Sequence, residues 1–462
     1  MAEGLETART TGAHLLDNLL LAQNVYAATV CGDTLRAQQA LDAMEPLLNP
    51  LWALDVHHFN YLRAGIQLMR GDTAAALKST DGLSERVQTT GAYFPLMVTD
   101  LLRGQALALS GQTEAAHAYL SRPLEFAQRF PSPQIAFQAG LLEAYIELQQ
   151  GADAQGLAAL QRALAAGRLI DSMALFPFWL PQLVAPLCAR ALEAGIEVDY
   201  VRRLIRRRGL LPESPASDVW PWPVRIFTLG RFAVLLDDQP VVCAGKAQKR
   251  PLQLIKALIA HGGRGVSATT LAQSLWADDA EDSRHALDMT LSRLRKLLGN
   301  EAAILTHDGK LSLNDKHCWL DIWAFERLSG NAERMRGDGA PAVCERAMAH
   351  YAGPFLGSED AAVWLLPRRE RLRSRYIRLA LAYGDSLEQA ADWQAAVSVF
   401  RRALEIEPLA EVITQRLMTT LLAHGEQSQA LEAFRRCREM LSIVLGVNPS
   451  ARTQSLAEQA KA

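Results

Sequence analysis

The sequence predicts a mainly α-helical protein in which small β-sheets are confined to the middle of the chain. Three observations support this prediction. A glycine-centred pattern repeats over residues 1–212, short runs alternate between apolar and polar residues over 224–320, and helical periodicity returns over 321–462. Because apolar residues recur every three or four positions in helices and every second position in strands, each change of period predicts a new domain.

Composition limits the class of protein. The 462 residues, 49% hydrophobic and 21% charged, suffice for a large folded core. A net charge of −2 argues against a protein that coats nucleic acid, so any such site must be a local basic patch. The six cysteines form no CxxC or Cys/His cluster, which argues against zinc and favours a reducing compartment. With no secretory leader and no run of about 18 apolar residues, we expect a soluble, cytoplasmic protein without a membrane partner.

Four glycines of the first zone recur at almost equal spacing, 39, 40 and 40 residues apart: Gly32, Gly71, Gly111 and Gly151. Each is followed by small residues and an apolar helical segment, so we expect each to end a helix in the left-handed conformation. A period near 40 predicts an α-solenoid of helix pairs, similar to tetratricopeptide (TPR) repeats, over residues 1–212. The pattern predicts architecture but identifies no ligand.

Two features close the first zone. The basic run RRLIRRR at 202–208 is expected to form a solvated last helical turn, where cations are favoured, although contact with nucleic acid is the alternative. The segment PESPASDVWPWP holds four prolines within 212–223. Since proline removes a hydrogen-bond donor and disfavours helix before it, we predict a stiff linker at 213–223.

The middle zone begins with VRIFTLGRFAVLLDD, which alternates as a pair of short strands would. A helix is predicted from Lys249 to His261 and a second from Ser267 to Trp276, followed by an acidic loop at 278–282. A third helix spans 284–298. Two strands joined at the Asp308-Gly309 turn then complete the order of a winged helix-turn-helix, with an additional sheet, over 224–320.

The third helix has two contrasting sides. Leucines recur at spacings of four, three and four residues and so share one stripe: Leu287, Leu291, Leu294 and Leu298. The opposite side carries His285, Met289, Ser292 and Lys296, with Arg293 close by. In a helix-turn-helix protein, an apolar stripe anchors the recognition helix while its other side lies in the major groove.

We therefore predict that the helix binds double-stranded DNA. Arg293 is expected to contact guanine or phosphate, Ser292 a base edge or the backbone, and Met289 a thymine methyl group. The other candidates are placed nearer the backbone or on the hairpin wing, whose tip would follow the minor groove: Arg284, His285, Thr290, Arg295, Lys296, Trp276, His307 and Lys310. The alternatives are a surface helix with solvated charges and, for Trp276, a purely structural role. His307 has no ligand partner at suitable spacing, so we expect no metal site there.

The last zone again repeats. Ala430 and Phe434 follow Ala396 and Phe400 by 34 residues, and Ala403 and Pro408 complete the first copy. This is the TPR period, so residues 321–462 are predicted to form a TPR-like, all-α domain.

The middle zone resembles the OmpR-type winged helix of the Streptomyces antibiotic regulatory proteins (SARPs). The resemblance rests on TLGRF (228–232), KRPLQLIKALI (249–259), LAQSLW (271–276), ALDMTLSRLRKLLG (286–299) and DGKLSL (308–313). It implies that Met289 and Arg293 face bases and that Trp276, Arg284 and Arg295 face phosphates. Ser292 stands where the family often has a basic residue, so one phosphate contact is in doubt.

The last zone is similar to the bacterial transcriptional activator domain of the same regulators. The matching segments are LDIWAFERL (320–328), YAGPFL (351–356), RRERLRSRY (368–376), PLAEVITQRLM (408–418) and LGVNPS (445–450). The resemblance implies contact with RNA polymerase and binding to DNA repeats by tandem or paired copies, such as a homodimer. Residues 1–212 resemble, more loosely, the repeats of MalT-like regulators, in which a nucleotide-binding module precedes the repeats. They are the expected sensor, with an effector ligand or protein on the solenoid.

No enzyme motif occurs: GxxxxGK[ST], HExxH and GxSxG are all absent, so we expect neither catalysis nor a cofactor. The adjacent His57 and His58 are expected to be exposed in mid-helix. Two further alternatives remain open. The winged helix could bind protein within an interaction scaffold, and the chain could be the C-terminal part of a larger, nucleotide-regulated activator.

Overall fold

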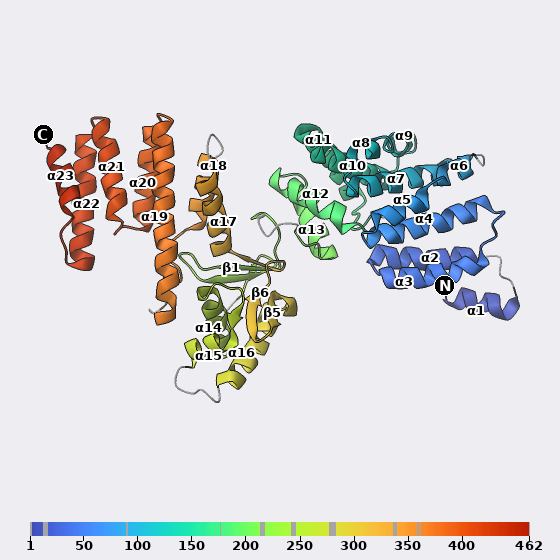
Figure 1. The fold of residues 1–462 in the computed structure, drawn as a ribbon, viewed down its shortest axis with the longest axis horizontal. Coiled ribbons are helices and arrows are strands. Elements are labelled where there is room, and N and C mark those ends of the chain that lie inside the picture. The colour runs from blue at the N-terminus through green and yellow to red at the C-terminus, as the bar shows by residue number, and fades with distance from the viewer. Residues whose placement is uncertain are drawn as a thin grey trace. The chain divides into compact units, whose positions relative to one another are not determined.

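The computed structural model describes residues 2–12, 17–88, 91–175, 177–212, 218–241, 246–276, 283–335, 340–357, 359 and 362–461. The chain divides into two compact units, Met1–Pro221 and Trp222–Ala462 (Figure 1). Helices dominate both units, and the strands of the described residues lie between 224 and 320. The predicted fold class is therefore confirmed. The acidic loop expected at 278–282 and part of the expected linker, 213–217, lie outside the described residues.

The first unit is a series of antiparallel helices. Their bounds are α1 Ala2–Thr11, α2 Asp17–Cys31, α3 Thr34–Met44, α4 Ala53–Met69, α5 Thr73–Thr80, α6 Leu83–Gln88, α7 Tyr93–Leu109, α8 Thr113–His117, α9 Ser121–Arg129, α10 Pro133–Gln149, α11 Asp153–Leu169, α12 Pro181–Glu193 and α13 Val198–Arg208.

The four repeated glycines end helices as predicted. Gly32, Gly71, Gly111 and Gly151 follow α2, α4, α7 and α10 with φ angles of 82°, 84°, 82° and 80°. In each case the next residue donates its N–H five residues back, as Asp33 does to the Ala28 carbonyl at 2.9 Å. This closes the orphan carbonyls of the last helical turn, and the left-handed φ disfavours any residue with a Cβ.

The segment after α11 packs against the solenoid's own helices. Phe178, Trp179 and Leu180 are buried, and a Cβ on Gly65 of α4 would lie 2.0 Å from the Phe178 ring. Gln182 Nε2 also donates to the Leu68 carbonyl at 3.3 Å. Part of the surface of α4 is therefore covered by residues 178–182.

The expected exposure of the two adjacent histidines was wrong. His57 is only 4% exposed, and its Nε2 lies 2.7 Å from Thr99 Oγ1 of α7. His58 Nε2 lies 2.5 Å from the Tyr26 hydroxyl of α2. Because α4 packs between α2 and α7, neighbouring positions on it face two different helices. Burial, assisted by His58, lowers the pKa of His57 to about 4.

The second unit begins with the winged helix. Its elements are β1 Val224–Phe227, β2 Ala233–Leu236, β3 Gln239–Pro240, α14 Lys246–Ala260, β4 Val266–Ser267, α15 Ala268–Leu275, α16 Ser283–Leu298, β5 Ile304–His307, β6 Lys310–Leu313 and β7 Cys318–Leu320. One sheet has the order β3-β2-β1-β7 and the other β4-β6-β5. The β5–β6 turn has positive φ at both Asp308 (47°) and Gly309 (68°), which matches the twist of a two-residue hairpin.

The remaining helices of the unit are α17 Asp321–Arg334, α18 Ala340–His350, α19 Leu366–Gln389, α20 Trp393–Ile406, α21 Glu411–Ala423, α22 Gln427–Leu445 and α23 Ala451–Gln459. The small and aromatic residues of the 34-residue pattern lie in their core, since Ala396, Phe400, Ala403 and Ala430 are fully buried. Phe400 fits against Gly384 of α19, where a Cβ would approach its ring to 2.1 Å. One hydrophobic core runs from Val224 to Ala460 and so joins the winged helix to these helices.

Candidate nucleic-acid interface

Helix α16 is anchored by its leucine stripe. Leu287, Leu291, Leu294 and Leu298 are between 0% and 6% exposed, and the helix packs against α14 and α15. Burying each leucine side chain contributes about 1.5–3 kcal/mol, so the stripe fixes which side of the helix faces outward.

The outward side of α16 carries most of the predicted residues. Arg284, His285, Ser292, Arg293 and Lys296 are exposed, and Met289 is 47% exposed. The spacing of His285, Met289, Ser292, Arg293 and Lys296 places them along one stripe. We call this stripe, together with the exposed Arg284 of the first turn at its edge, the outer face of α16. The exposed acid on this helix is Asp288, so three full positive charges stand against one negative charge.

Two predicted residues of α16 do not belong to this outer face. Thr290 is only 5% exposed because it lies between the turns of Leu287 and Leu294, so it is buried in the core rather than available on the surface as the predicted DNA contact requires. Arg295 is half-buried, and its Nη2 donates to the Ile304 carbonyl at 2.9 Å and to Thr306 Oγ1 at 2.8 Å. This guanidinium therefore holds strand β5, whereas the sequence predicted a contact between Arg295 and phosphate.

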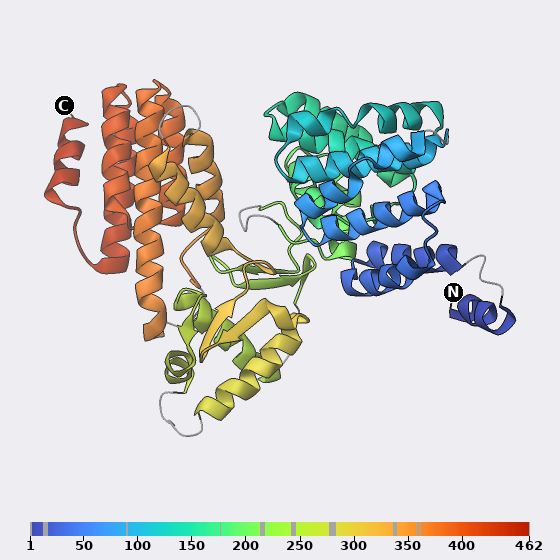
Figure 2. The ribbon, with the colours of Figure 1, turned by 45° about the vertical axis from the view of Figure 1, so that its right-hand side comes forward.

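The wing stands beside this helix (Figures 1 and 2), and the Arg295 bonds connect the two. His307 and Lys310 are exposed and face one another across the β5–β6 ladder. His307 Nδ1 lies 3.0 Å from the Asp308 carboxylate, so an acid partly balances this side chain. The tip is held to the start of α15 by the Ala268 N–H, which donates to the Gly309 carbonyl at 2.9 Å.

Trp276 follows the last turn of α15. Its half-buried ring packs against the core, and the Arg250 guanidinium lies 5.9 Å from the ring centre. Arg250 Nη1 also donates to the Leu275 carbonyl at 3.3 Å. Lys249 and Arg250 are exposed cations that our sequence reasoning did not include as candidates, although the basic segment KAQKR at the start of α14 indicated them.

A buried carboxylate fixes the winged helix to the helices that follow it. Asp321, the first residue of α17, is 2% exposed. Its Oδ2 accepts from the Thr228 N–H at 2.5 Å and the Leu229 N–H at 2.7 Å, and its Oδ1 accepts from Thr228 Oγ1 at 2.7 Å and the Ile322 N–H at 2.8 Å. Burial raises the pKa of Asp321 to about 6, against these hydrogen bonds, which lower it.

Backbone contacts complete this connection, which we call the joint (residues 228–230, Asp321 and 352–356). The Leu356 N–H donates to the Thr228 carbonyl at 2.8 Å, and the Gly230 N–H donates to the Pro354 carbonyl at 3.2 Å. Gly230 has a φ of 86°, and a Cβ there would lie 2.9 Å from the Ala352 backbone. The joint therefore requires glycine at position 230, and it ties the motif TLGRF to the later helices.

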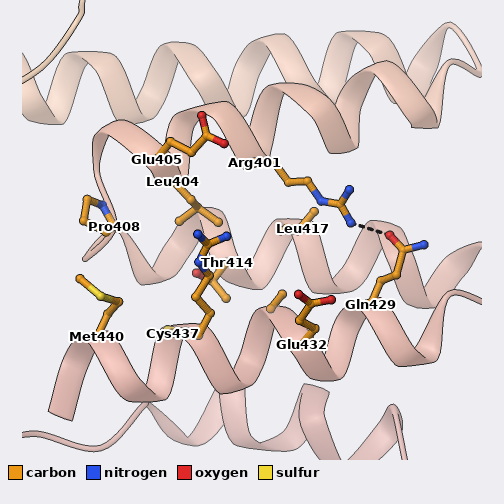
Figure 3. A pocket seen from close by; sticks show the side chains of 12 residues that line it. Arg401, Leu404, Glu405, Pro408, Thr414, Leu417, Gln429, Glu432, Cys437 and Met440 are labelled. Atoms are coloured by element: carbon orange, nitrogen blue, oxygen red, sulfur yellow. Dashed lines mark hydrogen bonds between the residues drawn. The ribbon is translucent and has the colours of Figure 1, made fainter. Parts of the chain in front are cut away.

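A hollow of about 520 Å³ lies between α20, α21 and α22 (Figure 3). Apolar residues such as Leu404, Leu417 and Met440 line it, together with Arg401, Arg436, Glu405 and Glu432. Its charges are mixed, and Arg401 Nη2 already donates to Gln429 Oε1 at 2.5 Å. This arrangement fits a protein segment better than a phosphate backbone.

The described ranges hold neither a metal-binding cluster nor a membrane-spanning helix. No group of three or more His, Cys, Asp or Glu side chains there could hold a metal ion. No helix within those ranges is long and apolar enough to span a bilayer.

Family models match both parts of the second unit. Residues 245–310 match the model described as transcriptional regulatory protein, C terminal, and residues 320–460 match the bacterial transcriptional activator domain. These two ranges contain the outer face of α16, the tip of the wing up to Lys310, and the later helices.

Curated relatives align over about half of the chain. The transcriptional regulatory protein EmbR of Mycobacterium tuberculosis is 26% identical over 242 residues, which cover 50% of this chain and 61% of that protein. The regulatory protein DnrI of Streptomyces peucetius is 26% identical over 45% of this chain and 82% of its own length. The transcriptional regulator RedD of Streptomyces coelicolor is 30% identical over 43% of this chain and 60% of its own length. The matched segment thus spans about three fifths of EmbR and RedD.

Among solved structures, EmbR of Mycobacterium tuberculosis in complex with a low-affinity phosphopeptide is 21% identical, with a TM-score of 0.40. It covers 52% of this chain and 65% of that one. The family models match two successive domains, and the curated relatives are all named as regulators. Residues 245–310 and 320–460 therefore form a transcriptional regulatory C-terminal domain followed by a bacterial transcriptional activator domain, the two domains that the sequence predicted from its resemblance to the SARPs.

Proposed function

We propose that the protein is a DNA-binding transcriptional regulator, and specifically an activator. The observation that carries this proposal is the outer face of α16. Its three cations are exposed on a helix whose opposite side is buried, within the range that matches the regulatory-domain model. A fixed helix of this kind, with an adjacent wing, has the geometry with which winged helices dock on a duplex.

The residues divide into two roles. Arg293 and Met289 lie near the middle of the outer face and would contact base edges, Arg293 with guanine and Met289 with a thymine methyl group. Arg284, Lys296 and Lys310 would contact phosphates, with His285, Ser292, His307 and the indole of Trp276 as supporting donors or acceptors. Arg250 adds a cation beside Trp276.

The activator domain would contact RNA polymerase, and the hollow between α20, α21 and α22 offers a mixed-charge surface for a protein partner. The joint would transmit the docked position of the winged helix to this domain, since Asp321 and Gly230 connect them directly. Binding to repeated sites by tandem or paired copies is part of the proposal, as is action in the cytoplasm, where bacterial promoters lie.

The solenoid would serve as the sensor or partner-docking arm. Residues 1–221 form a separate compact unit, which supports a distinct role for them. An effector that binds one arrangement of the protein better than another would shift the population of DNA-competent molecules. Deletion of residues 1–212 should therefore alter promoter response. Unchanged DNA affinity and unchanged response would remove the sensor role.

The central test is footprinting of the purified chain on its own upstream region, followed by affinity measurements at several salt concentrations. Binding to phosphates releases counterions, so affinity should fall steeply as salt rises. An interaction scaffold, whose winged helix contacts protein, would give no footprint and no such salt dependence.

A further inference from the structure

A second hollow, in the first unit, is formed by four separate parts of the chain. It measures about 400 Å³ and lies where the end of α2, the start of α10, the loop after α11 and the end of α13 meet. Val30, Met173 and Ala174 give it an apolar part. The remaining lining residues all carry hydrogen-bond donors, and two of them are arginines.

Arg208 is held rigidly at this hollow. Its Nη2 donates to the Val30 carbonyl at 2.7 Å, and its guanidinium stacks 4.0 Å from the ring centre of Trp179. The Nε of Arg208 is buried and has no hydrogen-bond partner among the described atoms. Burial lowers the pKa of Arg208, and the Cys31 thiol rather than a carboxylate opposes that shift. Half-buried guanidinium groups are normally compensated by an anion.

Gln134, another lining residue, also carries a buried donor without a hydrogen-bond partner among the described residues. Its Nε2 is also buried without a partner, while its Oε1 lies 3.5 Å from Ser172 Oγ. Ser172 is fixed in place because the Tyr200 hydroxyl donates to its carbonyl at 2.5 Å. A buried donor left without an acceptor costs about 1–3 kcal/mol, which a bound acceptor would recover.

The lining contains no acid. Arg207 is exposed at the rim, and the nearby Asp171 carboxylate is directed to Arg203, 3.4 Å away, on the outside of α13. Within the described part of this unit, neither Arg207 nor Arg208 forms an ion pair. Among the described residues, the hollow thus combines two arginines that form no ion pair, two buried donors without a partner and an apolar part.

We propose that this hollow binds a small organic anion, a carboxylate or phosphate ester with a short apolar portion. Arg207 and Arg208 would hold the anionic group, Gln134 Nε2 would donate to one of its oxygens, and Val30 and Met173 would cover its apolar portion. The site joins α2 to α13, residues at opposite ends of the solenoid sequence. The idea that this anion is the effector rests on the proposed regulatory function, but binding itself does not.

The test uses the full chain without DNA, titrated by calorimetry with benzoate, with phenyl phosphate and with uncharged benzyl alcohol. We expect one or both anions to bind and benzyl alcohol not to bind. Arg207→Gln, at an exposed position that leaves folding intact, should weaken the anion about 10-fold or more. Arg202→Gln removes the same charge from an exposed position of α13 outside the hollow and should change affinity less than about 2-fold.

Each outcome decides the proposal. A preference between benzoate and phenyl phosphate identifies the anionic group. Absence of binding by both at about 20 mM, or equal weakening by the Arg207 and Arg202 variants, overturns the site. If the unmodified chain did not bind DNA in a separate assay, the regulator proposal would be contradicted, but the anion-binding proposal would not be affected.

Discussion

The joint and the outer face of α16 are both rich in polar groups, but those of the joint are hydrogen-bonded within the chain and those of the outer face are exposed. At the joint, both oxygens of Asp321 accept hydrogen bonds from within the chain, four in all. On α16, Arg284, Arg293 and Lys296 extend from an anchored helix and are exposed. The difference separates polar residues that hold the fold from polar residues that remain available to a ligand. Arg293 and Arg295 make the same contrast only two residues apart.

The largest effect is expected at the joint. Asp321→Ala would leave the Thr228, Leu229 and Ile322 N–H groups buried without acceptors, so the free energy of unfolding of residues 222–462 should fall by about 3–5 kcal/mol. Urea denaturation of the full chain measures this. Asp315→Ala, which removes an exposed pair with Arg264, is the matched control and should cost less than about 1 kcal/mol. Equal costs for the two variants would mean that the joint is not a structural centre.

A buried histidine of the first unit extends the comparison to pH. The pKa of His57 is lowered to about 4 by burial, whereas the unfolded chain has a histidine pKa near 6.5. The neutral ring therefore stabilises the fold above about pH 6.5, and this contribution is lost as the pH falls towards 4. Relative to His57→Gln, the wild type should lose about 2–3 kcal/mol of unfolding free energy over that range. His117→Gln, at an exposed site, should show the same pH dependence of the unfolding free energy as the wild type. If His57→Gln also showed the wild-type pH dependence, the buried, neutral state of His57 would be contradicted.

The third effect concerns the outer face. Arg293→Ala should weaken binding to the specific site by about 1–3 kcal/mol and relax base preference at one position, while thermal stability stays unchanged. Fluorescence anisotropy with a set of single-base variants of the site measures both quantities. Arg371→Ala removes an exposed cation of α19 and serves as control. The control should leave affinity and base preference unchanged. If Arg293→Ala weakened all sequences equally, Arg293 would be a phosphate contact only.

Arg295 provides the internal counterpart of Arg293. Arg295→Met removes the bonds to Ile304 and Thr306 and should lower the unfolding free energy by about 1–2 kcal/mol. Base preference should be retained at temperatures where the variant is folded. A salt slope reduced by about one, without loss of stability, would restore the phosphate role that the family resemblance implied.

These cases show which parts of the molecule can be predicted from sequence. The leucine stripe, the glycine-ended helices and the Asp308-Gly309 turn depend on local periodicity or on the φ preference of one residue, so the sequence predicts them well. The hydrogen bonds of Arg295 depend on where strand β5 lies, and those of Asp321 depend on a turn 93 residues earlier in the chain. Local patterns in the sequence do not reveal either.

Burial of individual polar residues was the least predictable feature. Thr290 stands one residue from exposed Met289, yet a rotation of about 100° brings it into the core. His57 lies on a helix flanked by two others, which single-helix periodicity does not reveal. The short parallel strand β7, paired through Cys318 with Val224, has too few residues to show alternation and was missed for that reason.

The smallest effect is expected at the wing. It tests whether the wing only contacts phosphates or also recognises bases. Lys310 is exposed at the hairpin tip, whose backbone is fixed to the start of α15. Lys310→Ala should weaken all DNA sequences by less than about 1 kcal/mol and reduce the slope of log affinity against log salt by about 0.9, because one phosphate contact is lost. Lys316→Ala, an exposed cation in the turn before β7, should leave the slope unchanged. If the wing recognised bases, Lys310→Ala would instead alter sequence preference. The base-reading surface would then extend from the outer face of α16 to β5 and β6.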